Sequence, residues 1–297
     1  MMGTWSDKGR DGMDRRLVVL GTVLFILTGE IAAAQQEGGR IERSFSAEKG
    51  RMFKTRVEGD AGRVTIRGSD RPEEGSVSVH YKEDAFQVQV DLDEKNRELR
   101  IRLDKRDWLE GFDQDAETAL SIALPKAAEN LLEVDLKAGG LKLDLTDVRV
   151  RDLELRGWVG EMDVNFGVPN RSVIDELEIT LHVGKASLRN LGNANFEEAE
   201  INSDVGTLFV DFSGHIRRDG RVKIDTDVGQ LTLLLPRKVG VELSVSNTQF
   251  LSRVKLPDEL RRRSGRIYYS PNYEIAPHRL SLNLQAGVGS VEIKWAE

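Results

Sequence analysis

One unit repeats along this chain: an alternating apolar segment that ends in Val-Gly, followed by a second alternating segment whose first apolar residue comes two positions after the glycine. Its clearest copies run from Leu153 to Phe166 and from Ile201 to Phe212, and two more run from Val222 to Leu235 and from Leu280 to Trp295. Weaker copies complete a set of seven, whose marker glycines are Gly62, Gly140, Gly160, Gly184, Gly206, Gly229 and Gly289. From residue 140 to residue 229 the markers are 20, 24, 22 and 23 residues apart, a spacing typical of a solenoid or stacked array.

Each unit is expected to be two short strands around a corner. Within each half the apolar residues alternate, which predicts a strand with one buried face. In the copy around Gly229 the apolar residues before the glycine, Val222 to Val228, are even-numbered, and those after it, Leu231 to Leu235, are odd-numbered. A flat strand would turn its core face to solvent at that point. We therefore predict a corner or a bulge at each marker glycine, because glycine tolerates such backbone angles without strain.

The predicted fold class is all-β, with stacked strand repeats forming a β-solenoid similar to a single-stranded β-helix. The repeat domain is expected over residues 51–297, after a loose polar leader at 35–50. Between 76 and 124 several short alternating segments predict a hairpin-like section.

An insertion is expected at about 246–278, because no marker glycine occurs between Gly229 and Gly289. The segment from Leu256 to Arg263 begins with proline and acidic residues and is followed by Gly265. These signals predict one short helix within the insertion.

The first 34 residues have the pattern of a cleaved secretory signal peptide. Leu17 to Thr28 is an apolar run that follows two arginines and precedes Ala32-Ala33-Ala34, a small-residue cleavage site. A permanent membrane anchor is the alternative, but Glu30 ends the run before the roughly 20 apolar residues that a spanning helix needs. Met13 would give a more compact signal than Met1.

Composition restricts the partners and the chemistry. The formal net charge of -7 provides no general basic field, so nucleic acid is not an expected partner. The chain contains no cysteine, which excludes disulfides, a thiol nucleophile and cysteine-bound zinc. An exported chain without cysteine fits a bacterial envelope, and we expect it in the periplasm or at the cell surface.

The strand, Val-Gly, strand units, the segment LPRKVGVELSVS and the closing LSLNLQAGVGSVEIKW resemble the toast-rack group of bacterial envelope domains. That group includes an adhesin-like β-strand-repeat family and the C-terminal domain of LiaF-like antibiotic-response proteins. The resemblance covers roughly residues 50–297 and implies a stacked β fold outside the cytoplasmic membrane, used in envelope-stress sensing or surface interaction. It supplies no catalytic residues. The signal peptide in place of several membrane helices departs from the LiaF-like pattern.

The sequence offers no recognised catalytic, metal or cofactor motif. None of the four histidines, His80, His182, His215 and His278, has a spacing that brings two metal ligands together. Asp204, Asp225 and Asp227 near the corners could suggest calcium, but the nonapeptide calcium signature is missing, and turn-capping is the simpler interpretation. The outward positions after each marker glycine repeat no carboxylate pair, so no enzyme, cofactor or metal is expected.

The candidate interaction residues lie on outward positions and loops. Phe209 and Leu234 are outward on neighbouring units and could form an apolar patch, unless the insertion covers them. Arg261, Arg262 and Arg263 could bind an oxyanion beside Tyr268 and Tyr269, or could be the solvated end of the predicted helix. Trp108 and Phe112 could be a docking tip, or could fold back on the core. The full candidate set is Trp108, Phe112, Phe209, Leu234, Arg261, Arg262, Arg263, Tyr268 and Tyr269.

The sequence therefore predicts a non-catalytic exported envelope module that binds or senses an envelope protein or polymer. Two alternatives stay open. One is a carbohydrate-active β-helix enzyme, which would turn over a polysaccharide. The other is a purely structural spacer, in which changes to the candidate surface would leave every partner interaction intact.

Overall fold

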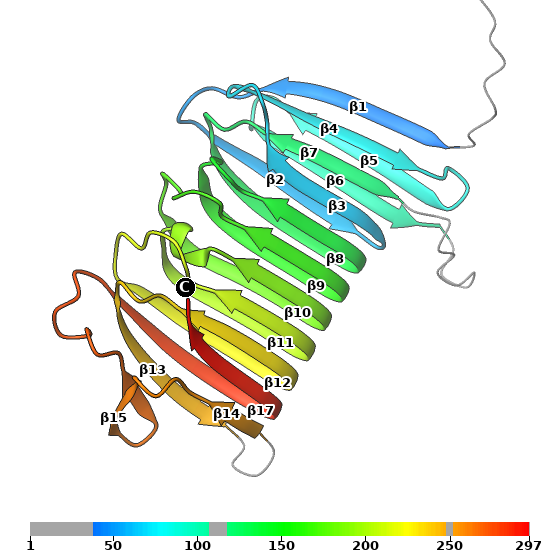
Figure 1. The fold of residues 1–297 in the computed structure, drawn as a ribbon. Coiled ribbons are helices and arrows are strands. Elements are labelled where there is room, and N and C mark those ends of the chain that lie inside the picture. The colour runs from blue at the N-terminus through cyan, green and yellow to red at the C-terminus, as the bar shows by residue number, and fades with distance from the viewer. Residues whose placement is uncertain (1–37, 107–117, 248–251, 297) are drawn as a thin grey trace, which may run out of the picture. The chain divides into compact units, whose positions relative to one another are not determined.

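The computed structural model describes residues 38–106, 118–247 and 252–296, which lie in a compact unit spanning Glu37–Glu297. The predicted signal peptide, Trp108 and Phe112 lie outside the described residues. The described part is all-β, as predicted: its strands join in one hydrogen-bonded sheet that is stacked strand upon strand (Figure 1).

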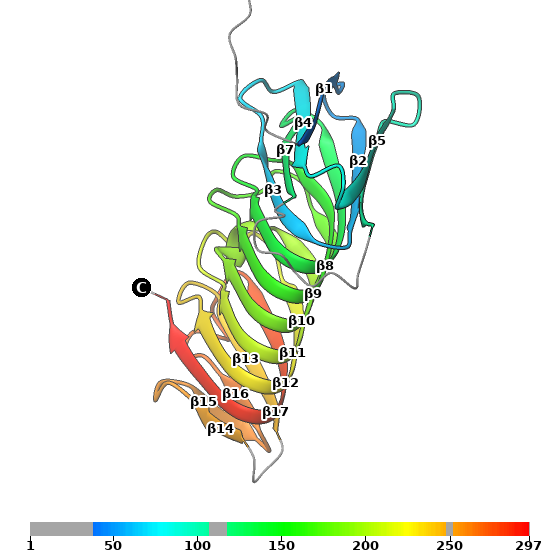
Figure 2. The same ribbon diagram turned by 90° about the vertical axis from the view of Figure 1, so that its right-hand side faces the viewer.

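Six long strands form the centre of the stack and pair in parallel, in the order β8, β9, β10, β11, β12, β17. Successive strands bend the same way, one beneath another (Figure 2). Each carries one copy of the repeat, and β17 follows β12 in space although four other strands lie between them in sequence. The bounds are β8 Glu129–Asp144, β9 Val150–Asn165, β10 Ile174–Arg189, β11 Phe196–Asp211, β12 Gly220–Leu235 and β17 Arg279–Trp295.

The corners form a column of in-register glycines with strongly positive φ. At Gly206 the φ angle is 146°, and a Cβ added there would lie 1.8 Å from the carbonyl oxygen of Gly184 on the neighbouring strand. In β8 the corner residue is Gly139, with φ 126°, and not Gly140 as predicted. Gly139 pairs with Gly160, whereas Gly140 pairs with Glu161. The repeat pattern also selects Gly139, because the apolar Leu141 lies two positions after it.

The predicted change of phase at the corner is confirmed. From Ala199 onward the buried residues of β11 are odd-numbered before Gly206 and even-numbered after it, so both halves of the strand face one core. The valine before each corner glycine is not part of that core, contrary to our assignment of Val228 to the apolar set. These valines form an exposed row on the outside of the bend: Val159, Val183, Val205, Val228 and Val288.

At the N-terminal end, shorter strands continue the stack. β2 (Met52–Gly59) and β3 (Gly62–Gly68) pair with the two halves of β8, and β6 (Glu98–Lys105) and β7 (Ala119–Leu124) follow on β2 and β3. The direction then reverses, as the hairpin-like prediction indicated: β5 (Phe86–Asp93) is antiparallel to β6, and β4 (Glu74–Tyr81) is antiparallel to β7.

Part of the predicted polar leader is instead the strand β1 (Gly39–Ser46), which pairs antiparallel with β4. Phe45 is buried and stacks on Phe53 with ring centroids 4.8 Å apart. The leader prediction was wrong for these residues because two apolar side chains in a charged segment, Phe45 and the partly buried Ile41, are enough to anchor a strand at an uncovered core end.

The insertion contains strands and no helix among its described residues. β13 (Gly240–Asn247) and β14 (Ser252–Lys255) pair with the two halves of β17 and add one more layer to the stack. β15 (Arg261–Ser264) and β16 (Ile267–Tyr269) form a hairpin on β13, turning at Gly265 with φ 52°. The proline and acids that predicted a helix form a turn, in which Leu260 N donates to Pro257 O.

Buried asparagines close the side of the stack opposite the corners. The Asn170 side chain donates to Val150 O and Ala194 O and accepts from Val150 N, which joins the start of β9 to a single 3-10 turn at Leu191–Asn193. Asn193 donates to Phe166 O in the same way. These bonds satisfy backbone carbonyls that are buried from water at the ends of the strands.

Candidate functional site

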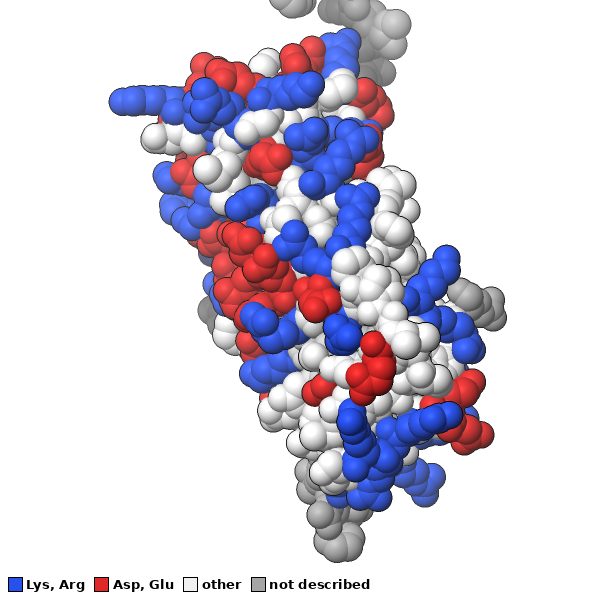
Figure 3. Space-filling model, turned by 90° about the vertical axis from the view of Figure 1, so that its left-hand side faces the viewer, with Lys and Arg blue, Asp and Glu red and all other residues white. Residues whose placement is uncertain are grey.

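In-register stacking arranges outward side chains in columns along the sheet. On the outer face of the half-strands before the corners, two neighbouring columns are acidic over three consecutive strands. They contain Asp152 and Glu154 on β9, Glu176 and Glu178 on β10, and Glu198 and Glu200 on β11. Figure 3 shows acidic side chains gathered midway along one side of the stack, with basic side chains beside them.

The carboxylates of this face differ in whether a basic side chain pairs with them. Glu198 pairs with Arg221, and Glu200 pairs with Lys223 at 2.8 Å, which lowers the pKa of Glu200. Within the described part of the chain neither Glu176 nor Glu178 has an ion-pair partner. Desolvation, together with the charges of Glu176, Glu154 and Glu200, raises the pKa of Glu178. Like charges that face each other across strands oppose folding, so the columns are not explained by stability.

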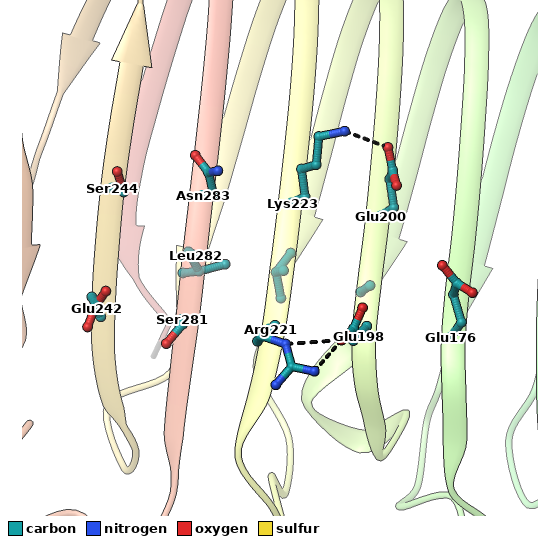
Figure 4. Close-up of a pocket in the computed structure, with 12 residues that line it drawn as sticks. Glu176, Glu198, Glu200, Arg221, Lys223, Glu242, Ser244, Ser281, Leu282 and Asn283 are labelled. Carbon is teal, nitrogen blue, oxygen red and sulfur yellow. Dashed lines mark hydrogen bonds and ion pairs between the residues drawn. The ribbon is translucent and has the colours of Figure 1, made fainter.

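Beside the acidic columns, the same face is hollowed into a trough of about 430 Å³ that reaches from β10 across β12 and β17 to β13. Its depth comes from three short side chains, Ser281 and Asn283 on β17 and Ser244 on β13, between longer charged neighbours. Figure 4 shows Glu242, Ser281 and Arg221 on three neighbouring strands, with Ser244, Asn283 and Lys223 one step further along. We refer to this hollow as the trough.

Two tyrosines lie beside Glu242, at the β13 end of the trough. The Tyr273 hydroxyl donates to Glu242 at 3.1 Å, and Tyr269 lies opposite Glu242 in the β13–β16 pairing. The two tyrosine rings meet edge to face with centroids 4.6 Å apart. Burial and the nearby carboxylate of Glu242 raise the pKa of both tyrosines, so both hydroxyls stay protonated at neutral pH.

The predicted arginine cluster is divided among separate contacts. Arg263 pairs with Glu274 at 3.1 Å and lies over the Tyr269 ring, whereas Arg262 donates to the Gly265 carbonyl. Arg261 to Arg263 are all exposed, and Tyr268 packs half-buried against the core. Tyr269 and Arg263 therefore adjoin the trough, and the three arginines do not converge on one point.

Phe209 and Leu234 lie on neighbouring strands but in different columns, since Phe209 pairs with Thr232 and Leu234 with Asp211. Phe209 is half-buried and lines a second hollow of about 440 Å³ on the outer face of the half-strands after the corners. The insertion forms its strand pairings with β17 and within itself. An apolar patch shared by the two residues stays a prediction.

The histidines do not assemble a metal site. His182 on β10 contacts Asp204 on β11 through Nδ1 at 2.6 Å, and its ring lies against the ring of Trp158 on β9. No group of three or more histidine and acidic side chains that could hold a metal occurs within the described ranges. Within the same ranges, no helix has the length and hydrophobicity that crossing a membrane requires.

Sequence reasoning missed the acidic columns and the trough for different reasons. Only outward positions after the glycines were compared, whereas the aligned positions before them read Glu154, Glu178 and Glu200. Counting back from each glycine would have found this column. The trough could not be found in this way, because it needs β13 and β17 side by side, with β17 placed between β12 and β13.

Residues 33–175 match the family model described as the N-terminal domain of toast_rack, DUF2154. This segment of the chain is similar to toast-rack N-terminal domains. The matched toast-rack region begins earlier than the resemblance read from the repeats and ends within β10. No curated protein matches the chain.

Solved structures similar to this chain include a candidate cell adhesion protein from Clostridium sporogenes, with 16% identity, a TM-score of 0.46, and coverage of 87% of this chain and 100% of that one. A candidate adhesin from Bacteroides fragilis has 13% identity, a TM-score of 0.29, and coverage of 86% and 97%. One from Parabacteroides merdae has 10% identity, a TM-score of 0.33, and coverage of 87% and 96%. At these scores the similarities carry no argument about function.

Proposed function

We propose that this protein is a non-catalytic, exported module of the cell envelope that binds an envelope protein or polymer through the trough. The observation that carries the proposal is the set of Ser244, Ser281 and Asn283, whose side chains make no hydrogen bond within the described part of the chain. They are held in register on adjacent strands, so their spacing is fixed before any ligand arrives. A stacked sheet of this kind acts by presenting groups on a rigid face.

Export is supported by the N-terminal sequence. The apolar run at 17–28, the preceding arginines and the alanines at 32–34 form a secretory signal pattern, and the chain lacks cysteine. Fusion of residues 1–40 to a reporter that is active only outside the cytoplasm tests this part. We expect activity, and loss of activity when Leu20 and Leu24 are each replaced by arginine.

One observation favours a second candidate, a carbohydrate-active enzyme. Glu178 and Glu200 are paired across β10 and β11, and their pKa values are shifted in opposite directions, upward for Glu178 and downward for Glu200. Retaining glycosidases use two carboxylates of this kind, about 5 Å apart, as acid and nucleophile. Release of reducing ends from a polysaccharide, abolished by Glu178→Gln and by Glu200→Gln, would favour this candidate.

The binding proposal is tested by sedimenting the purified protein with envelope fractions, separately for membranes and for cell-wall polymer. We expect it to bind one fraction, and the trough variant Ser281→Tyr to bind at least tenfold less. Gln285→Ala, on the same strand beyond the trough, is the control. If Ser281→Tyr folds and binds as the parent does, the trough is not the binding site and the spacer interpretation is favoured.

A further inference from the structure

Resting on the proposed function, we infer that the ligand of the trough is an uncharged carbohydrate chain lying across β12, β17 and β13. The inference comes from the arrangement of hydrogen-bonding groups and from the charge around the trough.

The outward side chains of the three strands form two parallel rows. One row is Arg221, Ser281 and Glu242, and the other is Lys223, Asn283 and Ser244, as the strand registers show (Figure 4). Adjacent members of a row are one strand spacing apart, about 4.8 Å. The rows mix an amide, two hydroxyls and a carboxylate, which together donate and accept. A ligand whose hydroxyls both donate and accept along its length matches such rows.

The charges at the trough disfavour an anionic ligand. Four carboxylates and two cations line it, and both cations are already paired, Arg221 with Glu198 and Lys223 with Glu200. An acidic polymer would have to break these pairs and would meet the unpaired Glu176. The uncharged groups of Ser244, Ser281 and Asn283 remain as the direct contacts.

A cationic peptide is the competing ligand, because the lining has an excess of negative charge. The side chains of Ser244, Ser281 and Asn283 are nevertheless uncharged, and Glu242 already accepts the Tyr273 hydroxyl. The half-exposed rings of Tyr269 and Tyr273 lie beside Glu242, with the Arg263 guanidinium over one ring and the Arg279 guanidinium over the other. The contacts left to a ligand are therefore the uncharged hydroxyl and amide groups, which match the hydroxyl edge of a sugar chain.

Isothermal titration of the purified protein tests the inference with five probes: chitohexaose, cellohexaose, maltohexaose, hexagalacturonate and hexalysine. We expect at least one of the three uncharged oligosaccharides to bind. Asn283→Ala should weaken that binding at least tenfold, and Glu242→Gln should weaken it several-fold. Gln285→Ala, an exposed residue on the same strand outside the trough, should bind as the parent does. Thermal melting of each variant verifies folding.

Binding of hexalysine or hexagalacturonate alone would overturn the inference, as would the failure of all three uncharged oligosaccharides. Equal binding by a folded Asn283→Ala variant would also overturn it. The proposed function is tested separately by the sedimentation experiment. If the envelope fraction is bound through the trough but no uncharged oligosaccharide binds or competes, the proposed binding function stands and the carbohydrate inference is wrong.

Discussion

At the scale of single residues, the column of corner glycines is the strictest requirement in the chain. Each glycine approaches the carbonyl of the preceding corner so closely that a Cβ would overlap it, and each has a φ that other residues rarely adopt. The overlap involves the Cβ atom and the φ angle belongs to the backbone, so no change of side-chain rotamer relieves either effect.

Gly206→Ala should therefore destabilise the protein by about 4 kcal/mol or more, or prevent folding. Gly140→Ala is the matched control, because its added Cβ would meet only the Arg63 side chain, at 3.9 Å. We expect that variant to stay within about 0.5 kcal/mol of the parent. Urea unfolding followed by circular dichroism measures both. Equal losses would mean that the corner does not have the geometry described.

The acidic columns make a second prediction, in which two neighbouring glutamates act in opposite directions. The folded state raises the pKa of Glu178, so its ionised form opposes folding above the unfolded-state pKa and the opposition disappears in acid. Glu178→Gln should stabilise the protein at pH 7 by at most about 1 kcal/mol, with no gain near about pH 3.

Glu200 is the counterpart, since the Lys223 ammonium and the Asn202 amide lower its pKa. Its contribution favours folding above the unfolded-state pKa and is lost as the pH falls through the folded-state pKa. Glu200→Gln should therefore lose stability at pH 7, again by at most about 1 kcal/mol. Unfolding curves at both pH values test the pair, and the same sign for both substitutions at pH 7 would contradict the electrostatic description.

At the scale of elements, the alternation of apolar residues located most strands but did not determine which strands pair with each other. The segments at 88–92, 99–103 and 120–124 are parts of β5, β6 and β7, because period-2 burial is a local property of a strand with one covered face. Arg261 to Ser264 have no apolar alternation, and they form a strand only because β16 lies beside them. Nothing within those four residues signals this pairing.

The valines before the corners give a prediction about the bend itself. Val205 is 45% exposed, whereas Val210, five residues later on the same strand, is fully buried. Threonine has nearly the same shape as valine but carries a hydroxyl, so Val210→Thr should cost about 1–3 kcal/mol. Val205→Thr should change stability by less than about 0.5 kcal/mol. A large loss at Val205 in thermal or urea unfolding would place that side chain inside the core.

At the scale of the whole molecule, a stack has two ends that its own repeats cannot cover. Each strand buries its inner face against its neighbours, so the last layer needs an element of different sequence. β1 supplies it at the N-terminal end, with Phe45 buried against Phe53 and next to Gly75.

Phe45→Ala should destabilise the protein by about 3–4 kcal/mol, which is typical of an aromatic truncation in a core. Ser44→Ala, the adjacent exposed position of β1, should be nearly neutral. If Phe45→Ala were equally neutral in calorimetric unfolding, residues 39–46 would be the loose leader that the sequence first suggested.

The sequence by itself determined the repeat, the strand periodicity, the change of phase and the use of glycine at the corners, because each follows from local backbone sterics and from one buried face per strand. Only the tertiary structure decided that residues 39–46 form β1, since their pairing with β4 is non-local. It also decided that β17 enters between β12 and β13, and so brings Asn283 beside Ser244. The trough exists because of that non-local pairing, which has no signature in any single segment of the chain.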